Sequence, residues 1–276
     1  MKKSIYILIA MMLFNIGRTA AETAKPYRIG VSLGYSFSGY REATYTDVNR
    51  LLNTLTFVLD GNIEKGKFLH SFNAGFFMGD SQIAADEVFI WRDIDHQTGE
   101  AFYQAENPRY AAIRGYFEYA LARRLWGNDI FPGYLGGTIR TDTYLQFANY
   151  PSITGLVSLN LHITQKWIID NENCLTLSLS VPVFGYAVRP PWAGADGALL
   201  KYAAQQPMNI MGILGMGRIT SLHNYWAVFG SIKYQHKVNS LISLYSGLGF
   251  ELSRINFPRP RTDAIFRINS GVAFTF

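Results

Sequence analysis

Three residues with the side chains of a serine hydrolase occur close together in the chain. Ser158, Asn160 and His162 occupy alternate positions of an otherwise apolar segment. A serine can attack an acyl group when a histidine within hydrogen-bond reach takes its proton. Residues two apart on a strand are separated by about 6.6–7 Å at the backbone, so Ser158 and His162 are about twice that distance apart. This spacing argues against a nucleophile and its base on one strand, and we expect no catalytic residue here.

Carboxylates gather in the segment from Asp93 to Glu100, which also contains Asp95 and His96. Oxygen ligands of this kind suit calcium, but the segment lacks the third loop carboxylate and the spacing of an EF-hand. We interpret it as a solvated acidic loop. The sequence contains no Gly-rich phosphate loop, no paired Cys/His zinc spacing and no Gly-x-Ser-x-Gly, so we expect neither a metal nor a cofactor.

Charged residues recur on one face of the predicted strands, the face that also carries Ser, Thr and Gly. They are Arg28, Asp60, Arg114, Glu118, Arg140, Asp142, Lys233, Glu251 and Arg267. Both signs are present, so we favour a structural salt-bridge network that fills a narrow barrel. The alternative is a charged constriction that selects solutes by sign. The five basic residues outnumber the four acidic ones, which would favour anions.

The elements that position these side chains alternate at period two. Between Arg109 and Arg123, for example, Phe117 and Tyr119 fall on one face, whereas Glu118 falls on the other. This pattern is typical of strands with one apolar and one polar face. Eleven such segments can be counted directly. Single-chain bacterial barrels have even numbers of strands, so we expect about 12, with 10 as the alternative and with the misread segment between 189 and 224.

Two segments depart from the alternation, and we interpret them as long exposed loops at 80–107 and 189–207. The first is acidic and has room for its own hairpin. The second opens with Pro190, Pro191 and Trp192 and continues into a short helix-like stretch.

Composition agrees with strands rather than with membrane helices. Aromatic residues make up 15% of the chain and the mean hydropathy is +0.04, yet no run of about 18 apolar residues follows the N-terminal segment. Strands whose faces alternate give such a near-neutral average, because each apolar residue is diluted by a polar one. The single cysteine, Cys174, cannot form an intrachain disulfide.

The first residues have the features of a cleaved signal peptide. Lys2 and Lys3 precede an apolar stretch from Ile5 to Ile16, and small residues end at Ala21. We expect residues 1–21 to be removed and 22–276 to form one domain. Removal of Lys2, Lys3 and Arg18 lowers the formal net charge from +5 to +2, so a nucleic-acid partner is not expected.

The last thirteen residues, Ala264–Phe276, place Phe266, Ile268, Phe274 and Phe276 on one face. This segment resembles the closing strand of a bacterial outer-membrane β-barrel. The resemblance covers the whole mature chain and implies that Phe274 and Phe276 are the signal read by the barrel assembly machinery. The chain is similar to uncharacterised barrel families of Bacteroidetes-type bacteria.

Aromatic residues near predicted strand ends favour a membrane barrel over a secreted or periplasmic β-protein. They are Tyr27, Tyr40, Trp126, Trp167, Trp192 and Trp226, and the tryptophans among them resemble interfacial girdles.

Outer-membrane phospholipases also use serine, histidine and asparagine, so Ser158, Asn160 and His162 resemble that family in residue type. The pattern of that family is His-x-Ser on one strand and Asn on the next, with the side chains facing lipid. Here all three residues share one strand and face the predicted lumen.

We therefore expect an all-β, transmembrane, antiparallel up-and-down barrel in the outer membrane of a Gram-negative bacterium. The first functional hypothesis is a small porin-like channel or solute-binding barrel with a charged lumen. The second is a structural or adhesive barrel with a closed lumen, which binds an extracellular partner through its long loops. The third is a lipid-modifying enzyme. The expected partners are outer-membrane lipid and the assembly machinery.

Overall fold

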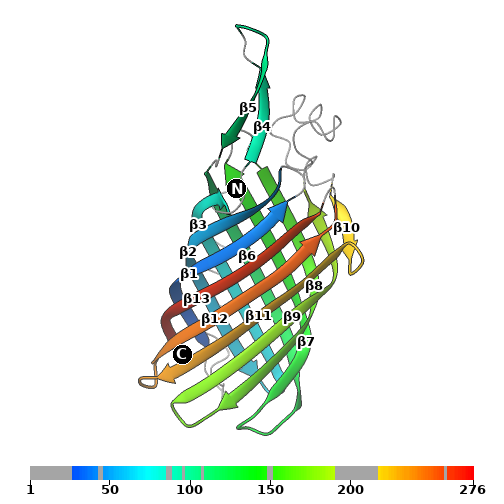
Figure 1. Ribbon diagram of the computed structural model, residues 1–276. Coiled ribbons are helices and arrows are strands. Elements are labelled where there is room, and N and C mark those ends of the chain that lie inside the picture. Colours follow the sequence, from blue (N-terminus) through cyan, green and yellow to red (C-terminus); the bar gives the residue numbers. More distant parts are fainter. Residues whose placement is uncertain are drawn as a thin grey trace, which may run out of the picture.

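The chain folds as a closed antiparallel β-barrel in a computed structural model (Figure 1). The structure describes residues 27–42, 46–84, 89–94, 97–106, 109–147, 152–189, 217–257 and 260–276. The predicted signal peptide, Trp192 and most of the predicted loop at 189–207 lie outside these residues. Among the residues described, no helix is long and apolar enough to cross a membrane.

Ten strands make up the barrel wall, which is the lower of the two numbers expected from the sequence. They are β1 (Arg28–Glu42), β2 (Thr46–Lys65), β3 (Phe68–Ile83), β6 (Tyr110–Trp126), β7 (Gly133–Phe147), β8 (Ser152–Ile168), β9 (Asn173–Val188), β11 (Tyr225–Lys237), β12 (Ile242–Ile255) and β13 (Arg261–Thr275). Each pairs with its neighbours along the chain, and β13 returns to β1.

Closure of the barrel depends on the C-terminal strand. β13 pairs with β1 from Arg28↔Thr275 to Glu42↔Arg261. The backbones of Tyr27 and Phe276 also exchange hydrogen bonds, at 3.1 and 2.9 Å. This pairing covers the edges of β1 and β13, as a sheet in a bilayer requires, because lipid offers the backbone no hydrogen-bond partner.

Three short strands lie outside this ten-strand ladder. β4 (Phe89–Ile94) and β5 (Ala101–Glu106) form a separate hairpin that projects beyond one rim of the barrel (Figure 1). The predicted loop at 80–107 therefore contains its own hairpin, although its first four residues, 80–83, belong to β3. β10 (Arg218–Ser221) adds to β9 above the start of β11.

The pairing between β9 and β11 is the shortest in the wall, and Pro182 gives the reason. β11 pairs with β9 only from Asn173 to Ser180. A proline has no N–H to donate to a ladder and is found at bulges and edges. The pairing of β9 with β8 also shifts register at this point, where Leu159 faces Phe184 and Asn160 faces Pro182. β10 then restores the ladder to the upper part of β9.

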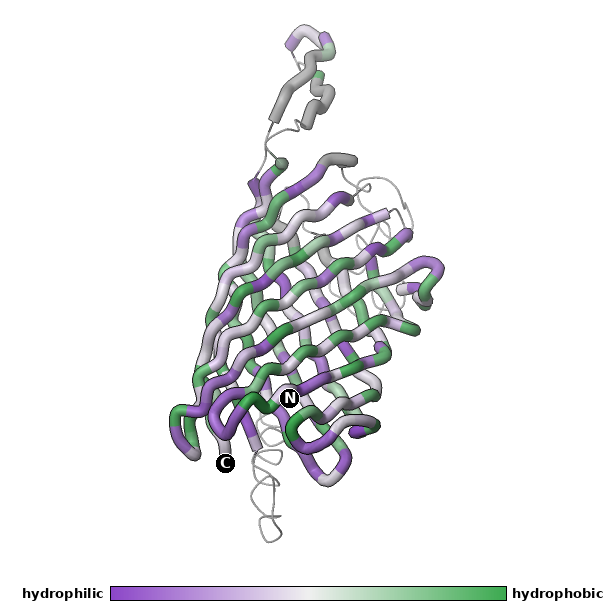
Figure 2. Tube along the Cα trace, turned by 60° about the horizontal axis from the view of Figure 1, so that its bottom comes forward, coloured by the Kyte–Doolittle hydropathy of each residue, from purple (hydrophilic) through white to green (hydrophobic). Residues whose placement is uncertain are grey.

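Side chains alternate across the wall as the sequence predicts. Apolar residues from every wall strand are exposed on the outside, among them Leu33, Leu55, Phe76, Phe117, Ile139, Leu161, Leu179, Ile232, Leu248 and Phe266. Figure 2 shows the same alternation as hydrophobic and hydrophilic residues that follow one another along the strands. A transmembrane barrel has an apolar outer face and a polar interior, whereas a soluble barrel has a polar outer face and an apolar interior.

The two ends of the barrel differ. Short connections at 66–67, 127–132, 169–172 and 238–241 lie at one end, and the connections that include the β4–β5 hairpin and β10 lie at the other. We call these the short-turn end and the long-loop end. In bacterial barrels short turns face the periplasm and long loops face the outside.

The aromatic residues expected near strand ends have different locations. Trp126 is exposed at the short-turn end, and Trp226 is exposed at the long-loop end. Trp167 packs edge-on against Phe131 near the short-turn end. Tyr40 does not face the membrane: it is buried inside the barrel, and its hydroxyl lies 2.7 Å from Ser81 Oγ. Tyr40 is inward because it falls on the polar face of β1, opposite in phase to Tyr35 and Phe37.

Candidate functional site

The nine charged residues predicted for the lumen all lie inside the wall, and they form two groups. The first, the central ion-pair cluster, consists of Arg114, Glu118, Arg140, Asp142 and Glu251. The second lines a cavity nearer the short-turn end and includes Arg28, Asp60, Lys233 and Arg267.

The central ion-pair cluster crosses the lumen. Arg114 donates to Asp142 at 2.7 Å and to Glu251 at 2.5 Å. Arg140 donates to Glu118 at 3.3 Å, to Asp142 at 2.8 Å and to Glu251 at 3.0 Å. Glu251 is on β12, five strands away from β6 and therefore on the opposite wall of a ten-strand barrel. The cluster thus joins facing walls across the centre of the barrel.

Aromatic rings complete this layer. The Arg140 guanidinium lies 4.5 Å from the ring centre of Tyr116 and 4.1 Å from that of Phe229. Only 3% of the Arg140 side chain and 5% of the Glu251 side chain are exposed. Buried charges are stable only when they are paired and hydrogen-bonded, as these are. Charges that are this deeply buried are not accessible to a solute in the lumen.

A second aromatic and ionic layer lies above the cluster, toward the long-loop end. Arg261 forms two-pronged bonds with Asp263 and lies over the rings of Tyr40 and Tyr144, at 5.0 and 4.4 Å. The cavities around this layer hold only about 20 and 60 Å³. Arg261 and Asp263 were not among the predicted lumen charges, although both fall on the polar face of the closing strand.

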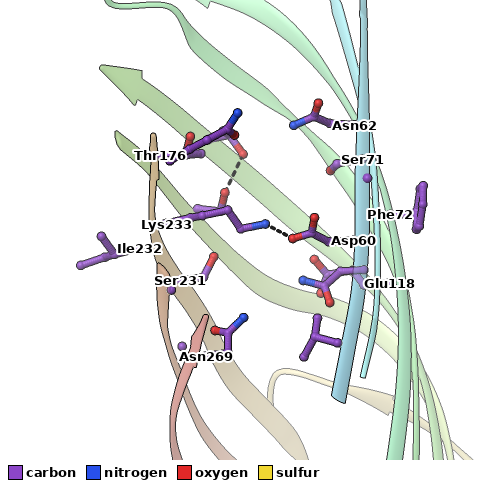
Figure 3. A pocket seen from close by; sticks show the side chains of 18 of the residues that line it. Asp60, Asn62, Ser71, Phe72, Glu118, Thr176, Ser231, Ile232, Lys233 and Asn269 are labelled. Carbon is purple, nitrogen blue, oxygen red and sulfur yellow. Dashed lines mark hydrogen bonds and ion pairs between the residues drawn. The ribbon is translucent and has the colours of Figure 1, made fainter. Parts of the chain in front are cut away.

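The larger cavity, which we call the lower cavity, occupies the short-turn half of the lumen. Its volume is about 140 Å³, and its lining reaches Asn62, Lys166 and Gln235, two or three residues from the ends of their strands. Arg28 donates to Asp60 at 3.1 Å, and Lys233 bonds to the same carboxylate from the facing wall. Figure 3 shows Asp60 and Lys233 directed toward one another across this space.

Lys166 and Glu64 connect facing walls at the bottom of the lumen. Lys166 lies 3.1 Å from Glu64, which also accepts a 2.5 Å bond from Tyr134. Neither residue was among the sequence-predicted lumen charges. A signal existed for Lys166, because it lies four residues beyond His162 on the same face of its strand.

Ser158, Asn160 and His162 face the lumen as predicted, but they do not form a catalytic triad. His162 lies 2.8 Å from both Ser180 and Thr164, and Asn160 donates to Thr138. Ser158 Oγ is buried and has no hydrogen-bond partner in the described part of the chain. Among the described residues, no group of three or more His, Cys, Asp or Glu could hold a metal ion.

Comparison with known proteins extends only to the fold. No protein family matches the sequence, and no curated protein does. Among solved structures, the outer-membrane protease OmpT of Escherichia coli is 8% identical, with a TM-score of 0.51 over 94% of this chain and 99% of that chain. An outer-membrane channel of Pseudomonas putida F1 is 11% identical, with a TM-score of 0.41 over 94% and 98%.

The likeness to OmpT supports the fold of a closed outer-membrane barrel. A closed antiparallel barrel with an apolar exterior and a polar interior spans a bilayer, and in bacteria such barrels occupy the outer membrane. The chain is therefore an outer-membrane β-barrel.

Proposed function

We propose that this protein is a solute-binding outer-membrane barrel whose lumen is closed at rest, rather than an open channel. The observation that carries this proposal is the central ion-pair cluster, which joins β6 and β7 to β12 across the lumen. An open filter needs charges that face water along a continuous path. Here the charges face one another.

The energetics support a closed state. Removal of one partner from a buried ion pair costs about 3–5 kcal/mol, because the other charge stays buried and unpaired. Glu251 contacts both Arg114 and Arg140, so passage of a solute would have to disrupt several such contacts together. The polar space that remains lies below the cluster, in the lower cavity, and it reaches the short-turn end.

The β4–β5 hairpin favours a second function, binding of an extracellular partner. It projects beyond the long-loop rim (Figure 1), where an adhesive barrel would contact a partner. A closed lumen suits this function as well. The two functions do not exclude one another, since they use opposite ends of the barrel.

Conductance of the refolded protein in planar bilayers tests whether the lumen is closed. We expect the wild type to give no discrete steps, and we expect a double variant, Arg140→Ala with Glu251→Ala, to give them. A matched control, Arg124→Ala with Asp129→Ala, removes an exposed pair at the short-turn rim and should stay silent. Reproducible steps from the folded wild type would refute the closed lumen.

Three further proposals concern targeting and ancestry. Residues 1–21 act as a cleaved signal peptide, Phe274 and Phe276 as the assembly signal, and the chain belongs to a Bacteroidetes-type barrel family. Phe274 and Phe276 are both exposed on the outside of the closing strand, where assembly factors can reach them before the barrel closes.

A further inference from the structure

We propose that the lower cavity binds a small oxyanion and that Arg267 is its principal ligand. This inference rests on the proposed solute-binding function and names the chemical class of the solute. Three observations carry it: the state of Arg267, the charge of the cavity lining and the size of the cavity.

Arg267 differs from the other basic residues of the lower cavity. Arg28 and Lys233 pair with Asp60, and Lys166 pairs with Glu64. The side chain of Arg267 has no hydrogen bond or ion pair with any residue that the structure describes. Its guanidinium lies against two aromatic faces, 5.1 Å from the ring centre of Tyr116 and 5.5 Å from that of Phe77. The hydrogen-bond donors of its guanidinium are therefore available to a ligand. A guanidinium binds oxyanions through paired N–H donors.

The backbone opposite Arg267 is shaped to admit its head group. Gly249 of β12 is the residue paired with Arg267 of β13. A Cβ at Gly249 would lie 3.0 Å from Arg267 Nε and 3.2 Å from its Nη2, closer than ordinary side-chain contacts. The absence of a side chain here lets the guanidinium lie along the cavity wall rather than be pushed away from it.

The lining of the lower cavity is positively charged. Four basic residues, Arg28, Lys166, Lys233 and Arg267, line it with two acidic ones, Asp60 and Glu118, an excess of two positive charges. One carboxylate, Asp60, serves both Arg28 and Lys233. Arg28 is also 94% buried, and its Nε and Nη2 have no hydrogen-bond partner among the residues that the structure describes. An anion would supply the missing negative charge.

The size of the cavity restricts the anion. At about 140 Å³ it is smaller than the roughly 300–1,000 Å³ pockets that hold drug-sized ligands. It has room for an ion of the size of phosphate or sulfate with a few waters. Neutral polar groups, among them Asn62, Ser71, Ser231 and Asn269, surround the charged ones (Figure 3) and can complete the coordination of such an ion.

Isothermal titration of the refolded protein in detergent micelles tests the inference. Sodium phosphate, sodium sulfate and the neutral polyol erythritol are titrated at one ionic strength, held with sodium chloride. We expect the two oxyanions to bind and erythritol not to bind. Arg267→Gln should weaken oxyanion binding about tenfold or more, because it removes charge-assisted hydrogen bonds. Arg267→Lys should retain more of the affinity, since it keeps the charge.

The control Arg124→Gln removes one positive charge at the short-turn rim, outside the cavity lining, and should bind as the wild type does. Lys233→Gln is a second cavity variant, expected to weaken binding independently if Arg267→Gln does not fold. Equal oxyanion affinity in the wild type and in both folded cavity variants would overturn the inference. Binding of erythritol alone would overturn it but leave solute binding intact, whereas binding of no solute would overturn both proposals.

Discussion

Arg140 and Glu251 meet across the lumen at 3.0 Å although 111 residues separate them in the sequence. One belongs to β7 and the other to β12, on facing walls of the barrel. Their side chains are almost wholly enclosed. This contact ties the two sides of the wall together and closes the interior that a channel would keep open.

Removal of Glu251 should destabilise the barrel strongly. Glu251→Ala leaves Arg114 and Arg140 each without one buried partner, so we expect a loss of about 3–5 kcal/mol in the free energy of unfolding. Urea unfolding of the protein in lipid vesicles measures this loss. Asp129→Ala, which breaks an exposed pair with Arg124, should change the same quantity by less than about 1 kcal/mol. Similar losses in the two variants would argue against a structural cluster.

A charged side chain on the outward face of β2 should destabilise the barrel. Leu55 is 68% exposed and lies near the middle of its strand. We expect Leu55→Arg to cost about 2–4 kcal/mol in vesicles, because the guanidinium would enter the hydrocarbon. Leu55→Ala is the control for lost side-chain volume, and it should cost clearly less. Equal losses from the two substitutions would mean that Leu55 does not face the bilayer core.

Ser158 should be dispensable. Its buried hydroxyl has no hydrogen-bond partner within the described ranges, and such a group costs about 1–3 kcal/mol of desolvation. Ser158→Ala should therefore leave the free energy of unfolding unchanged or raise it, and should leave phospholipid turnover by purified protein in vesicles unchanged. His162→Ala removes contacts with Ser180 and Thr164 and should destabilise. Phospholipid hydrolysis that disappears in Ser158→Ala would revive the enzyme hypothesis.

The turn between β8 and β9 should contribute a pH-dependent part of the stability. The pKa of Asp170 is lowered by hydrogen bonds from the Asn173 side chain and from the backbone N–H groups of Glu172 and Asn173. A carboxyl with a lowered pKa in the folded state stabilises above its unfolded pKa, and this stabilisation is lost as pH falls through the folded pKa.

Asp170→Asn should remove that dependence. Heat-denaturation midpoints, measured from pH 7 down to pH 3, should fall less in the variant than in the wild type. Glu172→Gln in the same turn serves as the control and should follow the wild type. Parallel curves for the wild type and Asp170→Asn would show that the turn carries no such linkage.

The sequence by itself determined the class of fold and the direction of the side chains. The alternation around Phe117, Glu118 and Tyr119 is a local property of one strand, since successive side chains of a strand point to opposite faces. It therefore placed the charged residues inside the barrel and the apolar ones outside without knowledge of the neighbouring strands. The same alternation places Tyr40 inside the barrel, although it lies near a strand end.

Only the tertiary structure decided the strand number and the pairing of the charges. The number of wall strands depends on how β10 and β11 share one edge of β9 around Pro182, which no local pattern reveals. Both arginine partners of Glu251, and the Lys233 partner of Asp60, come from strands on the far wall, because barrel closure brings together residues that are distant in the chain. For the same reason the sequence could place Arg267 among the lumen charges but not show its lack of a partner. Of the arginines and lysines that line the lower cavity, only Arg267 has no carboxylate partner among the described residues.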